Sequence, residues 1–291
     1  MTASSGLVVV DKPGGMTSHD VVSRVRRLAG TRKVGHAGTL DPMATGVLVL
    51  AVNRATRLLG QLTLTEKRYD ATIRLGTATT TDDAEGEVVA TRPIDGLTEA
   101  AVRDALSGFV GDLDQVPSAV SAVKLEGKRA YARVRAGEQV DLPARRVTIH
   151  TLQVNAVDVP DVGISVRCSS GTYIRAMARD LGAALGVGGH LAFLRRTAVG
   201  PFTLDDASTL DDLTEHFAMT PIADAARISF PTRDLDEAHA AHVRVGRPLD
   251  IALDRTTALF APDGEFLALY RPEDGRAKAV AVLWEGPSPS G

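Results

Sequence analysis

Hydrophobic and polar residues alternate along several stretches of the chain. Within residues 67–75, the apolar side chains of Tyr69, Ala71, Ile73 and Leu75 share one side of an extended chain, and polar residues take the other. A period of two is typical of a half-buried β-strand. Apolar and β-branched runs predict further strands at 7–10, 47–52, 147–157, 162–168 and 191–199, although the first half of the last run is also compatible with a helix.

Other stretches repeat apolar residues with the period of an amphipathic α-helix. Ser18 can cap a helix whose apolar residues recur from Val21 to Leu28 on one face. A second helix is predicted to open at Thr98, and a third to cover residues 172–185. Helices and strands therefore mix along the chain.

The chain divides into two predicted parts that meet near residues 230–232. Residues 1–230 carry the elements above. Residues 231–291 predict a small β-rich domain, with a short helix at 236–242 and a hairpin signalled by Pro262-Asp263-Gly264. Its last residues, 286–291, are expected to be a disordered tail.

Two segments of the first part have neither pattern. Residues 77–86 are polar and are predicted to form a loop. Residues from about 115 to 143 are rich in basic and small residues, and we interpret them as a protruding, partly mobile insertion.

Composition narrows the class of protein. The chain is 44% hydrophobic and 24% charged, as in soluble globular proteins. Cys168 is the single cysteine, which excludes an intrachain disulfide and a multi-cysteine zinc site. No apolar run approaches the roughly 18 residues of a membrane span, and no secretory signal pattern opens the chain. We therefore expect a cytoplasmic protein without a membrane partner.

The net charge is a weaker guide to the binding partner than the composition is to the class of protein. The net charge of −3 argues slightly against a nucleic-acid partner. Local basic clusters, one around Lys33 and one around Lys124 and Lys128, matter more than the sum. Solvated surface is the alternative explanation for each cluster.

The candidate chemistry centres on Asp41. It lies in a turn between an arginine-rich helix and an apolar strand, close to Gly35, His36 and Gly38 and directly before Pro42. An aspartate before proline is common in turns because it caps its own backbone. Glycines also allow a ligand to approach the backbone closely, which favours a catalytic acid. The pattern alone leaves both interpretations open.

A reactive carboxylate needs a cation that keeps it ionised. Arg175 follows a strand–turn–helix junction and could reach back to the sheet edge, although a surface arginine is the alternative. Tyr69 leads its strand and is either core or part of the site. The seven histidines are scattered, and we find no metal constellation, phosphate loop or dinucleotide fingerprint. No metal or cofactor is therefore expected.

Taken together, motifs along nearly the whole chain resemble the TruB family of tRNA pseudouridine synthases. Five of them occur in the family's order: residues 11–18 (DKPGGMTS), 35–42 (GHAGTLDP), 67–69 (KRY), 171–175 (GTYIR) and 194–197 (LRRT). Residues 121–131 are similar to the family's RNA-gripping thumb insertion, and the C-terminal part resembles a PUA-type RNA-binding domain.

This resemblance implies an α+β fold, in which a catalytic domain with a mixed, mainly antiparallel sheet flanked by helices is followed by a small β-rich PUA-like domain. It implies that a monomer isomerises uridine 55, in the T loop of tRNA, to pseudouridine without a cofactor. Asp41 would be the nucleophile or an electrostatic partner, Arg175 would pair with it, and Tyr69 would stack on the target base. The residues expected to bind the RNA are His36, Lys12, Lys33, Lys124, Lys128, Leu194 and Arg195.

Two other functions remain possible on the sequence. One is a non-catalytic tRNA-binding or tRNA-folding module of the same fold. The other is a glycosidase with Asp41 as its nucleophile, which would need a second carboxylate, from Asp70 or Asp83.

Overall fold

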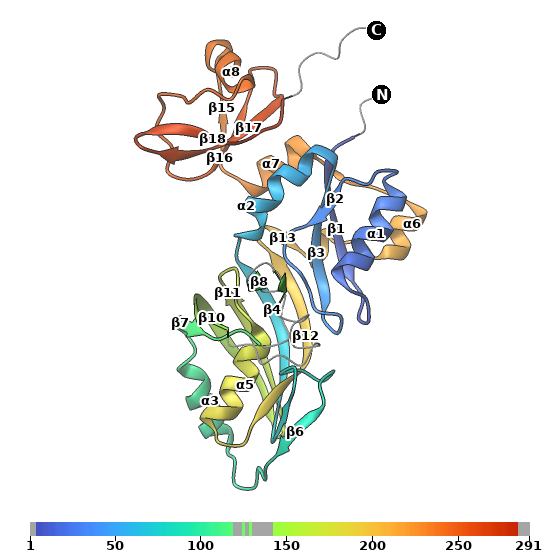
Figure 1. Cartoon of the computed structure of the whole chain (residues 1–291), viewed down its shortest axis with the longest axis vertical. Coiled ribbons are helices and arrows are strands. Elements are labelled where there is room, and N and C mark those ends of the chain that lie inside the picture. Colours follow the sequence, from blue (N-terminus) through green and yellow to red (C-terminus); the bar gives the residue numbers. More distant parts are fainter. Residues whose placement is uncertain (1–3, 119–123, 126–127, 130–141, 285–291) are drawn as a thin grey trace.

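The computed structural model describes residues 4–118, 124–125, 128–129 and 142–284. Figure 1 shows an elongated molecule in which one long β-sheet runs through the larger part and a small β-rich unit lies at one end. Most of the predicted insertion at 115–143 and the predicted disordered tail at 286–291 lie outside the described residues.

Ten strands form the long sheet. They are β1 (Gly6–Lys12), β2 (Val34–His36), β3 (Thr45–Val52), β4 (Lys67–Leu75), β7 (Gly111–Gln115), β10 (Arg145–Asp158), β11 (Asp161–Cys168), β12 (Gly189–Val199), β13 (Phe202–Thr203) and β14 (Thr220–Pro221). Their order is β14-β1-β3-β12-β4-β11-β10-β7, with β2 added beside β3 and β13 beside β12. The β3–β12 pair is parallel and the other described pairs are antiparallel, so the predicted mixed, mainly antiparallel sheet is confirmed.

The register at the centre of this sheet brings three distant segments together. Arg196 of β12 lies opposite Gly46 of β3 on one side and opposite Tyr69 of β4 on the other. The loop that carries Asp41 leads directly into β3. The sheet therefore places the Asp41 loop beside Tyr69.

The predicted strands at 67–75 and 191–199 are both present. β4 has the predicted bounds, and its inner residues from Lys67 to Leu75 are buried at every second position. β12 begins two residues earlier than predicted and is a strand throughout, which removes the helical alternative for its first half.

Helices cover this sheet. They are α1 (Ser18–Leu28), α2 (Leu59–Thr63), α3 (Glu99–Ser107), α5 (Ile174–Ala184), α6 (Leu210–Glu215) and α7 (Ile222–Ser229), with a 3₁₀ turn at Asn53–Leu58. In Figure 1, α3 and α5 lie together at the far end of the sheet, and α1 and α6 lie beside β1.

The starts of two helices differ from the predictions. Thr17, not Ser18, caps α1, because Thr17 and Asp20 form a reciprocal capping box. The Ser18 hydroxyl instead donates to the carbonyl of Leu40 and accepts from its amide. The helix predicted from residue 172 begins at Ile174, because Tyr173 takes the extended N-cap conformation.

The predicted loop at 77–86 is wrong for its first residues. β5 (Thr77–Thr79) pairs with β6 (Val88–Thr91) as a separate hairpin. Threonine is β-branched and favours extended backbone, which polarity alone does not reveal. The remaining residues, up to Gly86, connect the two strands.

The C-terminal part forms its own four-stranded sheet. Its elements are β15 (Thr232–Asp234), α8 (Glu237–Arg244), β16 (Thr257–Phe260), β17 (Phe266–Glu273) and β18 (Arg276–Val282). The predicted hairpin is confirmed as the β16–β17 turn, in which Gly264 has a φ of +85°. Phe260 and Phe266 share a buried cluster with Leu58 and Leu62, so this sheet packs against the larger part. This buried cluster joins residues on both sides of 230–232. The domain boundary that we place there therefore stays a proposal.

Two further observations complete the fold. β8 (Lys124–Leu125) and β9 (Lys128–Arg129) pair within the insertion. None of the described helices combines the length and apolar character that crossing a bilayer requires.

Candidate active site

A pocket opens where the Asp41 loop, β4, β12 and the start of α5 meet. Its volume is about 250 Å³, and Asp41, Tyr69, Arg175 and Leu194 all line it. That volume lies just below the range of about 300–1,000 Å³ that is usual for ligand pockets. By volume, the pocket can therefore hold one small group, such as a nucleobase.

Arg175 joins two carboxylates at the wall of this pocket. Its Nε lies 3.0 Å from Oδ2 of Asp41, and its Nη2 donates to Oδ1 of Asp41 at 3.3 Å. Its Nη1 lies 3.4 Å from Oδ2 of Asp83. The side chains of Arg175 and Asp83 are 6% and 5% exposed, whereas that of Asp41 is 35% exposed. Asp41 is thus the acid of this group that a ligand can reach.

The loop around Asp41 is held by buried cations. Arg196 is 1% exposed, and its guanidinium donates to the carbonyls of Gly38 and Val47. The Lys12 ammonium donates to the carbonyls of Met16 and Pro42 at 2.7 and 3.2 Å. Burial lowers the pKa of Lys12 to about 8. These bonds fix the loop on both sides of Asp41.

Glycines permit this close packing. Gly46 has a φ of +99°, and a side chain there would collide with the backbone of Arg196. Gly38 has a φ of +95°, which residues other than glycine rarely adopt. The sequence needs both glycines to bring the Asp41 loop against β12.

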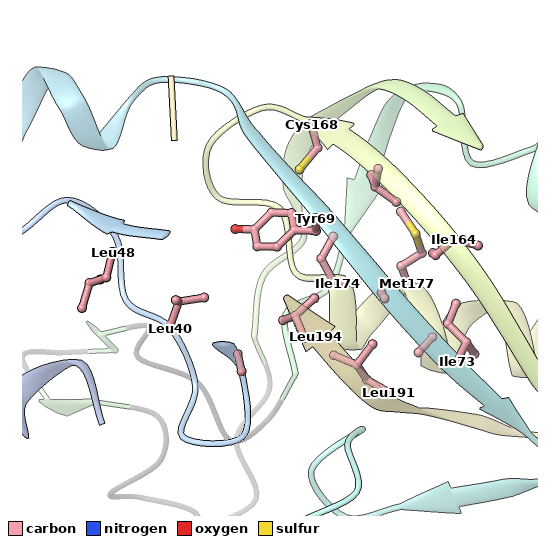
Figure 2. Close-up of a cluster of buried hydrophobic side chains, with 14 of the residues drawn as sticks. Leu40, Leu48, Tyr69, Ile73, Ile164, Cys168, Ile174, Met177, Leu191 and Leu194 are labelled. Carbon is pink, nitrogen blue, oxygen red and sulfur yellow. The ribbon is translucent and has the colours of Figure 1, made fainter. Parts of the chain in front are cut away.

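Tyr69 forms one face of the pocket. Figure 2 shows its ring among buried apolar side chains, with the hydroxyl pointing away from β4 toward the side of Leu40 and Leu48. Leu194 and Ile174 lie beside it in the same cluster and also line the pocket. Burial raises the pKa of Tyr69, which keeps its hydroxyl protonated at neutral pH. An aromatic face with apolar neighbours can stack a base.

The other predicted site residues lie outside the pocket lining. The buried side chain of Lys12 holds the loop and also lines a second cavity, of about 700 Å³, so its expected contact with RNA stays a prediction. Arg195 pairs with Asp11 at 2.7 Å and lines the same cavity. His36 packs edge-on against His19, with ring centroids 5.8 Å apart. Lys33 is exposed, and the side chains of Lys124 and Lys128 lie outside the described residues.

Two buried cations of the site, Lys67 and Arg196, lie in motifs of the sequence but received no role in the predicted site. Lys67 lies two residues before Tyr69, and Arg196 two residues after Leu194, so strand periodicity places both on the inner face. A charged residue at an inward position was the available signal.

Gln115 connects the end of β7 to the helix that carries Arg175. Its side-chain amide donates to the carbonyl of Tyr173 at 2.9 Å, and its side-chain oxygen accepts from the Tyr173 amide at 2.8 Å. We expect Gln115→Leu to lower the free energy of unfolding by about 1–3 kcal/mol in urea titrations, because it removes both bonds. Gln115→Glu should lose at least as much at neutral pH, because it sets a buried carboxylate against the Tyr173 carbonyl that the amide now donates to. A Gln115→Leu variant as stable as wild type would contradict this assignment.

No cluster of three or more potential metal ligands occurs within the described ranges. The described lining of the pocket combines one accessible carboxylate, Asp41, with the cations Lys67, Arg175 and Arg196 and with an aromatic and apolar wall.

Comparisons with known proteins agree on a family. The family model described as "TruB family pseudouridylate synthase (N terminal domain)" matches residues 26–174, and two models of the corresponding C-terminal regions match 175–238 and 230–284. Similar chains include "tRNA pseudouridine synthase B" of Arthrobacter sp. (strain FB24), 56% identical over 96% of both chains. The protein of the same name from Thermobifida fusca (strain YX) is also 56% identical, over 96% of this chain and 99% of its own.

Solved structures resemble the chain over most of its length. The crystal structure of a Cbf5-Nop10-Gar1 complex contains a chain that is 27% identical with a TM-score of 0.74, covering 95% of this chain and 83% of its own. An H/ACA RNP bound to a substrate RNA containing 2'-deoxyuridine gives a TM-score of 0.71 at 26% identity, with the same coverage.

Proposed function

This chain belongs to the TruB family of pseudouridylate synthases, and we propose that it converts uridine 55 in the T loop of tRNA to pseudouridine, with Asp41 as the essential acid. The observation that carries the proposal is the single accessible carboxylate, held by Arg175 in a base-sized pocket. The relatives' name supports tRNA as the substrate.

The pocket residues have separate roles in this proposal. The target nucleotide leaves the loop of the tRNA, at a cost of a few kcal/mol of lost stacking. Stacking on Tyr69 returns about 1–3 kcal/mol, and Leu194 closes the apolar side. Asp41 then faces the ribose or the base, oriented by the two contacts from Arg175. The protonated hydroxyl of Tyr69 acts as a hydrogen-bond donor.

Isomerisation balances without a redox partner. The bond between N1 of the base and C1′ of the ribose breaks, the base turns, and C5 joins C1′; the C5 proton leaves and N1 takes up a proton. No electron is gained or lost overall. The chain's own groups supply charge and position, which is the main contribution expected from a preorganised site.

Contacts to phosphate position the RNA in this proposal. Exposed basic residues such as Lys33 are available for it. We expect tRNA binding to weaken about 10- to 100-fold between 50 and 200 mM salt, because phosphate contacts release counterions. Filter binding over this range measures the slope, and Lys33→Met should make it shallower by about one unit. An affinity that does not change with salt would contradict the use of this basic surface.

Release of tritium from tRNA labelled at C5 of uridine tests catalysis directly. An active synthase releases one tritium per converted uridine, whereas a non-catalytic RNA-binding module binds the tRNA and releases none. Absence of release from tRNA that the protein binds would overturn the proposed activity.

A glycosidase is less well supported by the same geometry. Its second carboxylate would have to be free to donate a proton. Asp83 is nearly buried and its oxygens contact Arg175, the Thr81 hydroxyl and the Glu85 amide. Asp70 bonds to Ser165 from the adjacent strand and does not line the pocket. Neither Asp83 nor Asp70 is placed to be the proton-donating carboxylate of a glycosidase.

A further inference from the structure

Lys67 places an additional positive charge in the pocket wall. It is the first residue of β4, 6% exposed, and lines the pocket with Tyr69 and Asp41. Its ammonium donates to the carbonyls of Thr63 and Thr65 at 2.5 and 2.6 Å. An ammonium has three N–H donors. Within the described part of the chain, one donor is therefore left for a ligand.

A purely structural role explains this lysine poorly. Burying an ammonium costs several kcal/mol unless an opposite charge compensates it. No carboxylate pairs with Lys67 among the described ion pairs, and the nearby charge of Arg196 opposes its own. A neutral donor would hold the carbonyls of Thr63 and Thr65 at less cost. The charge itself therefore calls for an explanation.

Its charge persists at neutral pH. Burial lowers the pKa of Lys67 to about 8, and repulsion from Arg196 adds to this effect. Below that value the ammonium form predominates. The group is thus a cation under ordinary assay conditions, near 7.

We propose that the ammonium of Lys67 binds a carbonyl oxygen of the target uracil and stabilises the negative charge that the base acquires when it leaves the ribose. The inference rests on the proposed function. When the N1–C1′ bond breaks, its electron pair stays with the base and spreads over N1 and the ring oxygens. Lys67 keeps its proton throughout, and C5 later bonds to C1′ and loses its own proton. Preorganised charge at such a position typically contributes 10²–10³-fold to the rate.

The test compares two substrates in single-turnover reactions with saturating tRNA. One tRNA carries uridine at the target position, and the other carries 5-fluorouridine, whose fluorine stabilises the departing base by itself. We expect Lys67→Met to slow consumption of uridine about 100-fold and that of 5-fluorouridine at least fivefold less. Affinity for tRNA should stay within about threefold of wild type, and Lys67→Arg should recover most of the rate.

Two controls keep the test decisive. Arg74→Met removes an exposed cation from the far end of the same strand, where the residue pairs with Asp161, and should leave both rates unchanged. If Lys67→Met does not fold, Lys67→Gln keeps a donor for the carbonyls without the charge. Lys67→Met or Lys67→Gln with the wild-type rate, or slowed equally on both substrates, overturns the inference. Failure of the wild-type protein to convert either tRNA would instead overturn the proposed function.

Discussion

Asp41→Asn is expected to lower the single-turnover rate of pseudouridine formation by about 10⁴-fold or more, while tRNA affinity stays within roughly tenfold of wild type. The amide has the size of the carboxylate but cannot serve as an anionic nucleophile, and loss of such a group typically costs this much. Arg175 still pairs with Asp83 in the variant, so its buried guanidinium keeps a counter-charge. Rapid-quench assays give the rate, and filter binding gives the affinity.

Asp70→Asn is the matched control for this experiment. Asp70 follows Tyr69 in β4, is partly buried, and accepts a hydrogen bond from Ser165 outside the pocket. We expect its rate to stay within about threefold of wild type. Full activity in Asp41→Asn would remove Asp41 from the mechanism.

Arg175→Met is expected to lower both stability and activity. The side chain of Asp83 would remain buried without its cation, a situation that typically costs about 3–5 kcal/mol. Asp41 would at the same time lose both contacts that orient it. Urea titration measures the first effect, and the single-turnover rate, which should fall at least about 100-fold, measures the second.

The double variant Arg175→Met with Asp83→Asn separates these effects. Removing the stranded charge should restore much of the stability, because a buried neutral amide costs far less than an unpaired carboxylate. It should not restore the rate, since Asp41 still lacks its arginine. Recovery of activity together with stability would show that Arg175 serves only to hold the fold.

The sequence pattern predicted much of the framework because strand periodicity is a local property. The bounds of β4 are those read from its alternation, and the end of β12 at Val199 was also predicted. Helix starts were less accurate, since capping depends on details such as the bond between Thr17 and Asp20. The pairing of β5 with β6 depends on which strand meets which, and local polarity does not carry that information.

The site was predicted only in part for a similar reason. The motif resemblance grouped Asp41, Tyr69 and Arg175, and the structure brings them to one pocket. The RNA contact expected of Lys12 stays a prediction, while its ammonium donates to the carbonyl of Pro42, 30 residues away. Only the fold shows that contact. Lys67 and Arg196 were overlooked, although inward-facing charges on strands are readable from the alternation itself.

Mapping every modified uridine in tRNA after incubation with the purified protein, without added cofactor, tests the central claim most directly. The account predicts pseudouridine at position 55 with the wild-type protein and unmodified uridine there with Asp41→Asn. Unmodified uridine at position 55 after treatment with the wild-type protein, or pseudouridine formed by Asp41→Asn, would contradict it.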